Sequence, residues 1–417
     1  MVSAPRAGQG LTSARIRHYH HRVILQRLRR LGEASKADLA RAVNLTNTAI
    51  GQIVSDLRDL GLVSVIGKRY EGQRGQPATM LRLEPNGAYG IGVRLDRSRI
   101  ETALVDLGGR LISQRSHTMP LPSPEEALAM ISADVEAYYD LAERLSPGRV
   151  LGIGLARPYH LGAWLDRLDL NNPALKLWDD VDFAAALQNA TGLDVHEEND
   201  GTAAAIAELF HGFGRECDDF AYFFLGPAIG GGVILHGDYR RGRSGNAGDV
   251  AMLPVPRSKL ASAPPARGPY EVLLTRASVA ALVRHLAWHG HTVSELDALP
   301  AAIAACPVGF EEWMEDCVQA LIGPMLAAQA LLDVSNVVLD GDLGAEIMGR
   351  LTERLRLAME QTMPEACVPP ALRLGTFGSN AHSLGAASLP LFIDFAPRAA
   401  VEANARPLKG GHDSRAA

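Results

Sequence analysis

The chain has 417 residues, 47% of them hydrophobic, which is enough for about two or three domains with buried cores. It contains neither a charged-then-apolar leader nor an apolar run of about 18 residues, so we expect a cytoplasmic protein that is neither secreted nor membrane-spanning. The cysteines are widely spaced, which argues against a disulfide framework or a zinc cluster and predicts free, mostly buried thiols. They are Cys217, Cys306, Cys317 and Cys367.

Charge is divided unevenly along the chain. Residues 1–80 carry 13 Lys or Arg against 5 Asp or Glu, which leaves 28 against 42 for the remainder. A basic N-terminal part binds a polyanion by releasing its counterions, whereas an acidic body repels it. The distribution therefore indicates that nucleic acid is bound at the N-terminal end.

Residues 35–61 have the pattern of two short helices joined by a tight turn. Ser35 and Asp38 fit a capping box at the start of the first helix. Leu39 and Ala42 are expected on its buried side. A third helix is predicted upstream from apolar residues at helical spacing: Ile24, Leu28 and Leu31.

The second helix of this pair is predicted to begin at its cap, Thr46. Its inward stripe follows the spacing i, i+3, i+4 and i+7: Ile50, Ile53, Val54 and Leu57. Gly51 lies on another face and is small enough to let the helix approach DNA closely. The side chains predicted to face bases or the nearby backbone are Thr46, Asn47, Thr48 and Gln52.

A β-hairpin with a basic tip is predicted next. Residues 62–66 and 78–83 have strand patterns, and residues 67–77 are rich in turn formers. Lys68 and Arg74 are expected to meet phosphate or the minor groove, since Arg74 lies between glycines that add little steric bulk.

Other functions fit the same small fold. A solvated hairpin or a protein-docking module can share it, and Arg41, a further candidate for phosphate contact, is of a type that is often only solvated on a helix. The concentration of positive charge in this part of the chain favours DNA binding.

From Tyr89 onward, short strands alternate with helices, as is typical of a mixed α/β fold. An antiparallel meander, a long amphipathic helix and a further strand are predicted at residues 89–95, 100–106, 111–116, 124–145 and 150–155. A buried strand over 220–225 is predicted to enter a glycine-rich turn over 226–232, and a turn of that composition can cradle phosphate.

Three motifs follow the hairpin and meander in order: Glu198-Asn199-Asp200, Gly245-Asn246-Ala247-Gly248-Asp249 and Leu384-Gly385-Ala386-Ala387. With the glycine run, this arrangement resembles the ROK family over about residues 15–397. That family contains repressors and sugar kinases with a two-lobed, actin-like ATPase fold of the ribonuclease H type, and its kinases lack the N-terminal head. The resemblance implies an α/β protein with a winged helix-turn-helix head and a sugar-responsive repressor function.

Composition, local pattern and this resemblance together predict four parts. Residues 1–14 and 396–417 are expected to be disordered, residues 15–84 to form the winged helix-turn-helix, and residues 85–395 to form the effector and oligomerisation domain. Two-fold pairing of heads predicts a homodimer or homotetramer on palindromic double-stranded operator DNA.

The nucleotide loops depart from the pattern of the family's kinases. The first, D-I-G-G-T-K in kinases, reads Arg-Leu-Asp-Arg-Ser-Arg over residues 94–99. In the second, Pro227 removes a backbone donor and Ala228 adds a side chain. In the third, Asp340-Gly341-Asp342 adds negative charge beside a would-be polyphosphate. We therefore expect no ATP site and no enzymatic activity.

The resemblance implies a site for a small carbohydrate effector: Asn171, Asn172, Asn199, Asp200, Asp249 and Glu271. Asp200 matches the kinases' catalytic base, and Asp249 stands where the family has Glu. Without the resemblance, Asn199 and Asp200 read as a helix cap, and Asn171 and Asn172 read as an ordinary turn.

The family's structural zinc is expected to be absent, because Met252 replaces its His ligand and residues 258–267 contain no thiol. Two histidine clusters are not predicted to bind metal: His18, His20 and His21, which are placed near DNA, and His285, His289 and His291, which are placed at a frayed helix end. Two alternatives to the repressor remain open: an ATP-dependent sugar kinase with an appended head, and a DNA-binding regulator that responds to no effector.

Overall fold

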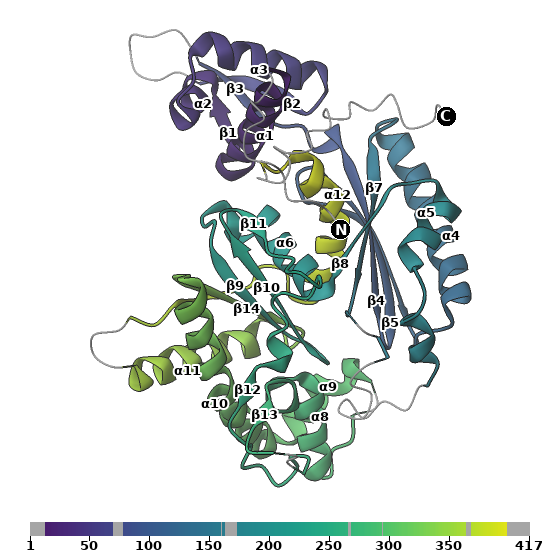
Figure 1. Cartoon of the computed structure of the whole chain (residues 1–417), viewed down its shortest axis with the longest axis vertical. Coiled ribbons are helices and arrows are strands. Elements are labelled where there is room, and N and C mark those ends of the chain that lie inside the picture. Colours follow the sequence, from purple (N-terminus) through teal and green to yellow (C-terminus); the bar gives the residue numbers. More distant parts are fainter. Residues whose placement is uncertain are drawn as a thin grey trace. The chain divides into compact units, whose positions relative to one another are not determined.

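The computed structural model describes residues 13–69, 78–159, 161–162, 173–265, 268–293, 295–363 and 368–397. The chain forms two compact units (Figure 1). The first comprises Met1–Ala156, Asp182–Glu197 and Ser383–Ala417, and the second comprises Arg157–Val181 and Glu198–His382. The predicted disordered ends fall mostly outside the described residues, although Ala396 is buried and its N–H donates to the Phe392 carbonyl.

The first unit begins with a small head of three helices and a three-stranded sheet. Its elements are α1 (Ser13–Leu31), β1 (Glu33–Ser35), α2 (Lys36–Val43), α3 (Asn47–Asp59), β2 (Val63–Arg69) and β3 (Ala78–Leu83). The sheet order is β1-β3-β2, and β3 is antiparallel to both neighbours. Ser35 and Asp38 form the predicted capping box, and Thr46 caps α3 as predicted. The helix pair and the hairpin strands are therefore confirmed.

Three details of the head differ from the sequence prediction. Ala40, not Ala42, joins Leu39 on the buried side of α2, because α2 turns only this face to the rest of the head. Leu31 is 54% exposed, since it is the last residue of α1 and lies beyond the packed turns. Strand β2 continues to Arg69, and the rest of the predicted turn, residues 70–77, lies outside the described residues.

The rest of the first unit is built on a five-stranded sheet of order β6-β5-β4-β7-β8. Its strands are β4 (Tyr89–Asp96), β5 (Arg99–Asp106), β6 (Leu111–Thr118), β7 (Val150–Arg157) and β8 (Val195–Asn199). Strands β4 to β6 form the predicted antiparallel meander, and β7 runs parallel to β4. Helices α4 (Pro124–Leu145) and α5 (Phe183–Thr191) lie on one face, and α12 (Ala381–Phe395) lies on the other (Figure 1).

Glycines in β4 and β7 let α12 lie directly on the sheet. A Cβ atom on Gly90 would lie 1.9 Å from the Ala387 carbonyl oxygen, and one on Gly154 would lie 1.9 Å from the Ala386 carbonyl oxygen. Such contacts are far inside van der Waals distance. The small residues of the motif near the C-terminal end therefore serve packing between helix and sheet.

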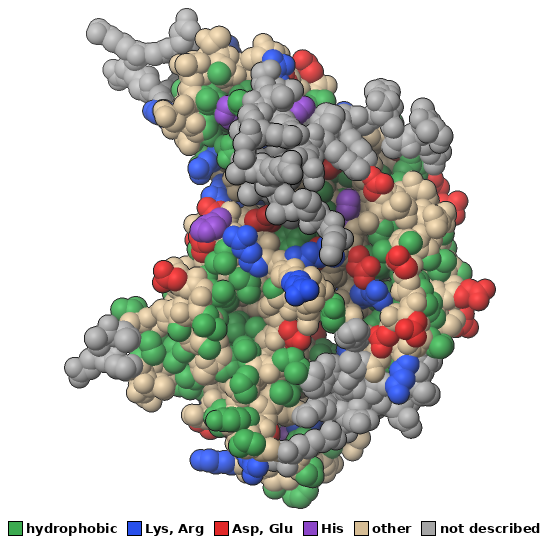
Figure 2. Space-filling model, viewed as in Figure 1, with side chains coloured by type: hydrophobic (Ala, Val, Ile, Leu, Met, Phe, Trp, Pro, Cys, Tyr) green, Lys and Arg blue, Asp and Glu red, His purple; other side chains and the backbone are tan. Residues whose placement is uncertain are grey.

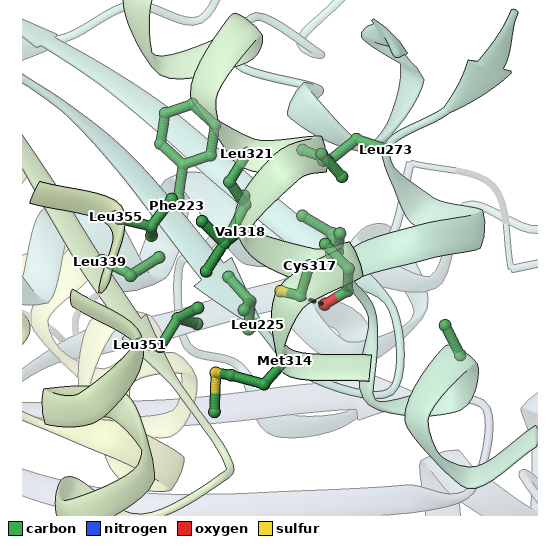
Figure 3. Packing of buried hydrophobic residues seen from close by; sticks show 14 of the residues in the cluster. Phe223, Leu225, Leu273, Met314, Cys317, Val318, Leu321, Leu339, Leu351 and Leu355 are labelled. Atoms are coloured by element: carbon green, nitrogen blue, oxygen red, sulfur yellow. Dashed lines mark hydrogen bonds between the residues drawn. The ribbon is translucent and has the colours of Figure 1, made fainter. Parts of the chain in front are cut away.

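The second unit contains a mixed sheet of order β11-β10-β9-β14-β15. The strands are β9 (Phe220–Leu225), β10 (Ile229–Leu235), β11 (Asp238–Tyr239), β14 (Asn336–Gly341) and β15 (Ala371–Leu374). Helices α6 (Asp200–His211), α10 (Pro307–Leu332) and α11 (Ala345–Thr362) accompany it. Figure 3 shows side chains of the sheet meeting those of α10 and α11 in a buried apolar cluster: Phe223, Leu225, Leu339, Val318, Leu321, Leu351 and Leu355.

Smaller elements complete the second unit: β12 (Pro254–Val255), β13 (Glu271–Val272), α7 (Leu274–Ala277), α8 (Val279–Trp288) and α9 (Leu299–Ala305). Strands β12 and β13 pair with each other. Of the cysteines, Cys306 and Cys317 are buried free thiols and Cys217 is a partly buried one, as predicted, and Cys367 lies outside the described residues.

A buried ion pair fixes α7 to α10. The guanidinium of Arg276 donates from Nε to Oδ2 of Asp316 at 3.0 Å and from Nη2 to Oδ1 at 2.6 Å. Its Nη1 donates to the Pro256 carbonyl at 2.7 Å. The two charged side chains are only 4% and 7% exposed, so each depends on the other for its charge to be compensated.

We expect Asp316→Ala to lower the free energy of unfolding by about 3–5 kcal/mol, because Arg276 would stay buried with an uncompensated charge. The control is Arg356→Ala, which breaks pairs with Glu353 and Glu360 on the exposed face of α11 and should change stability little. Urea unfolding followed by circular dichroism measures both. Equal losses in the two variants would contradict this account.

Candidate nucleic-acid interface and effector site

Helix α3 has an exposed polar face and a buried apolar face. Its inward residues Ile50, Ile53, Val54 and Leu57 are buried, as predicted. Asn47, Thr48 and Gln52 are exposed. The hydroxyl of Thr46 accepts the Ala49 N–H at 3.2 Å and so fixes the start of the helix. The structure thus places the predicted base-facing residues together on one exposed helix end.

Gln52 is oriented by a hydrogen bond network that the sequence did not reveal. Its Nε2 donates to Oδ1 of Asp56 at 2.8 Å, and Oδ2 of Asp56 lies 3.2 Å from Nε2 of His21. Burial acts to raise the pKa of Asp56, but the hydrogen bonds from Gln52 and His21 outweigh it and lower that pKa. His21 is buried and links α1 to α3 through Asp56.

The predicted phosphate contacts lie around α2 and the hairpin. The side chain of Arg41 is 74% exposed and lies 2.5 Å from Oδ1 of Asp38, and Arg69 lies 3.3 Å from Oδ2 of the same residue. Hydrogen bonds from Ser35 lower the pKa of Asp38 to about 2, so it stays charged and holds both arginines. Lys68 is exposed on β2. Arg74 lies outside the described residues.

The face around α3 has room for a closely approaching partner at Gly51. A Cβ atom added there would meet no heavy atom within 4 Å, so packing within the protein does not require a glycine. Glycine also costs helix stability relative to alanine. Packing within the protein and helix stability therefore do not account for the glycine at this position.

The candidate effector residues begin at the N-terminus of α6. The Oδ1 atom of Asn199 accepts the N–H groups of Gly201 at 3.0 Å and Thr202 at 3.3 Å, which is the geometry of an N-cap. Oδ1 of Asp200 also accepts the Gly201 N–H, at 2.9 Å. The cap interpretation that the sequence left open is therefore correct for Asn199.

The glycine run packs against this helix end. Strand β10 begins at Ile229, so the turn covers only residues 226–228 and the predicted longer turn is wrong. A Cβ on Gly201 would lie 2.4 Å from the Gly231 nitrogen, and a Cβ on Gly231 would lie 2.7 Å from the Gly248 oxygen. These glycines are required because α6, β10 and the loop before Asp249 touch through their backbones.

This packing brings two of the predicted effector residues to the same place. Asp200 and Asp249 each adjoin a glycine that contacts Gly231. Oδ2 of Asp249 accepts the side-chain amide of Asn246 at 2.9 Å, and burial raises the pKa of Asp249. Asp200 and Asp249 therefore lie beside the same strand, and carboxylates can accept hydrogen bonds from hydroxyl groups.

The other predicted effector residues are not brought to this place by the described contacts. Glu271 lies on β13, where it accepts the Ser258 N–H at 3.4 Å and the Thr275 hydroxyl at 3.3 Å. Asn171 and Asn172 lie outside the described residues. Glu198, which the sequence placed only in a motif, accepts the hydroxyl of Tyr239 at 2.8 Å. No short-range sequence signal links residues so far apart.

The segments that match kinase nucleotide loops have other structural roles. At the first, Arg94 donates to Glu101 at 2.9 Å across β4 and β5, and both side chains are buried. At the third, the buried carboxylate of Asp340 accepts the Tyr222 hydroxyl at 3.0 Å. Burial raises the pKa of Asp340. Each of these two segments thus carries a buried charged side chain held by a hydrogen bond.

Known proteins share this arrangement. The model of the ROK family matches residues 90–391. An uncharacterized protein of Sinorhizobium fredii, y4fQ, is 27% identical over 90% of this chain and 91% of its own length. The Bacillus subtilis xylose repressor is 23% identical over 58% of this chain and 61% of its own length. The Escherichia coli DNA-binding transcriptional repressor Mlc is 26% identical over half of each chain.

Two solved structures show the same fold. One is a ROK family transcriptional regulator described as a homologue of E. coli Mlc. The alignment covers 90% of this chain and 96% of that regulator at 21% identity, and the TM-score is 0.63. The other is a ROK hexokinase from Thermus thermophilus. The alignment covers 72% of this chain and 96% of the hexokinase at 25% identity, and the TM-score is 0.55.

Fold and comparisons define an α/β protein with a winged helix-turn-helix head on a sugar-kinase-like, actin-like ATPase fold. The chain belongs to the ROK family. The resemblance inferred from its motifs is thereby confirmed. Among the residues that the structure describes, none of the helices is both long enough and apolar enough to span a membrane.

We expect Gly51→Ala to leave the head folded, or stabilise it by up to about 1 kcal/mol, while weakening DNA binding at least severalfold because a methyl group would separate α3 from the groove. Gly349→Ala is the matched control: Gly349 lies inside α11 and its added Cβ also meets nothing within 4 Å. Thermal unfolding and fluorescence anisotropy measure the two effects. Unchanged DNA affinity in Gly51→Ala would show that the glycine has no role at an interface.

Proposed function

We propose that this chain is a sequence-specific DNA-binding transcriptional regulator that represses carbohydrate uptake or metabolism genes and responds to a small sugar. The observation that supports it best is the exposed polar end of α3, capped by Thr46 and bare at Gly51. Relatives named as xylose repressors and as Mlc support the same function. The alignments with these repressors span only 50–61% of the repressors' lengths. The proposed function therefore depends on the exposed end of α3 as well as on sequence similarity.

In this proposal, the first turns of α3 enter the major groove. Asn47, Thr48 and Gln52 offer amide and hydroxyl groups that pair with base edges, while Thr46 contacts the nearby backbone. Arg41, Lys68 and Arg74 bind phosphate or the minor groove and supply affinity that falls with salt. Two heads related by a two-fold axis read a palindromic operator.

The charge distribution supports binding at the head alone. On the face seen in Figure 2, acidic side chains gather at the right of the view, where α4 carries the exposed Glu125, Glu136 and Asp140. A DNA polyanion is repelled from such a surface. The contrast with the basic N-terminal residues favours DNA that engages the head and avoids the acidic sheet and helices.

Contacts within the first unit connect the head to the rest of that unit. Nη1 of Arg149, which precedes β7, donates to the Leu60 carbonyl at the end of α3, at 2.6 Å. Nε of the buried Arg22 in α1 donates to the Asp394 carbonyl at the end of α12, at 2.7 Å. A change in β7 or α12 would thus reach α1 and α3 directly, which is what a two-state effector response needs.

A sugar kinase with an appended head is the second candidate. Asp200 at the start of α6 supports it, since the residue matches a family kinase's catalytic base. The buried pair of Arg94 with Glu101 opposes it, as does the buried Asp340, because both put charged side chains where phosphate needs backbone donors.

We expect Gln52→Ala to weaken binding to the chain's own promoter by about 5- to 150-fold, the equivalent of about 1–3 kcal/mol for a base contact, without changing nonspecific binding. The control is Gln319→Ala on α10, where Gln319 likewise donates to a carboxylate four residues away, Glu315. Anisotropy at fixed salt on promoter and scrambled DNA measures both. Equal selectivity in Gln52→Ala and the wild type would contradict base reading by α3.

We expect one sugar of a monosaccharide panel to raise the unfolding temperature and release promoter DNA, and Asp200→Asn to abolish both effects while retaining DNA binding. Asp219→Asn is the control, because exposed Asp219 accepts a backbone N–H in the same unit, from His236. ATP with Mg²⁺ should neither stabilise the protein nor yield a sugar phosphate. Phosphate transfer would establish the kinase, and promoter binding unmoved by every sugar would favour an effector-independent regulator.

A further inference from the structure

Three side chains outside the candidate effector residues converge in the second unit. His285 lies in α8, His289 is the C-cap residue of that helix, and Glu312 lies in the second turn of α10. One ligand-type atom from each lies within 4.8 Å of the other two. The Nε2 atoms of His285 and His289 are 3.0 Å and 2.9 Å from the same Oε2 atom of Glu312.

The two histidines are held by the backbone and by a neighbouring hydroxyl. A spacing of four residues puts both on one side of the helix end, and the His289 N–H donates to the His285 carbonyl. Nδ1 of His285 lies 2.8 Å from the Ser262 hydroxyl, which fixes the orientation of the ring. Ligand histidines typically have such a partner on the nitrogen away from the metal.

The cluster of His285, His289 and Glu312 is buried on one side and open to solvent on the other. His285 is buried, and its two ring nitrogens lie against the Ser262 hydroxyl and the Glu312 carboxylate. The side chains of His289 and Glu312 are 29% and 47% exposed, so an ion has a path in from solvent. Cys306 is also near, since its sulfur and the His289 ring both lie within 3 Å of a Cβ position built on Gly309.

We propose that His285, His289 and Glu312 form a binding site for a divalent transition-metal ion of the Zn²⁺ type. Two imidazole nitrogens and one carboxylate oxygen are a donor set that such ions accept, with the remaining position open to water. The residues differ from Met252 and residues 258–267, where the family's own zinc ligands would stand.

A metal ion bound here would join three segments that the chain otherwise holds by separate contacts. It links the end of α8 to α10, and Ser262 extends the link to the segment between β12 and β13. Strand β13 carries Glu271. Metal binding would therefore stabilise the second unit and fix the segment that leads to this candidate effector residue.

The test uses the tag-free, full-length protein after chelation and dialysis. Titration calorimetry with ZnCl₂ should show one tight site per chain, Co²⁺ should give a visible absorption band, and Zn²⁺ should raise the unfolding temperature. His289→Ala and Glu312→Gln should each abolish these effects, and both sites are exposed enough for the variants to fold. Ser262→Ala should weaken affinity by about 10–100-fold.

The matched control is His291→Ala, which removes a neighbouring, partly exposed histidine that is not a ligand. It should retain wild-type metal affinity. Wild-type affinity in both His289→Ala and Glu312→Gln would overturn the site and attribute binding to other histidines, such as those of α1. Absence of Zn²⁺ and Co²⁺ binding by the wild-type protein would overturn it directly. This test does not measure DNA binding. A negative result would therefore refute the metal site without bearing on the proposed function as a DNA-binding regulator.

Discussion

Backbone contact at glycines is the constraint on which the second unit depends. Gly201 at the start of α6, Gly231 in β10 and Gly248 before Asp249 approach so closely that a single added Cβ would displace main-chain atoms. Because main-chain atoms cannot yield as flexible side chains do, this contact fixes the strand, the helix end and the loop in one arrangement. The positions of Asp200 and Asp249 follow from it.

The same device recurs in the first unit, where α12 lies on Gly90 and Gly154. There it sets the depth of a helix on a sheet, and the end of that helix receives the guanidinium of Arg22 from α1. Helix α12 thus packs closely on the sheet and also accepts a hydrogen bond from the head.

The glycine run has a packing role that its composition does not reveal. Its composition indicates a phosphate-cradling turn, but Gly230 to Gly232 lie within a paired strand whose glycines admit α6. At the first nucleotide-loop position, Arg94 and Glu101 form a buried pair that local sequence does not predict, since its partners come from two strands.

The head was predictable from sequence because its signals are local. The capping box of Ser35 and Asp38, the cap at Thr46 and the inward stripe of α3 all depend on residues a few positions apart, whose geometry the helix itself sets. The family and the α/β fold were predictable from the order of motifs. Tertiary structure alone decided which distant groups meet, as with Gln52 through Asp56 and His21, or His289 and Glu312, because side chains on different elements are brought together only by packing.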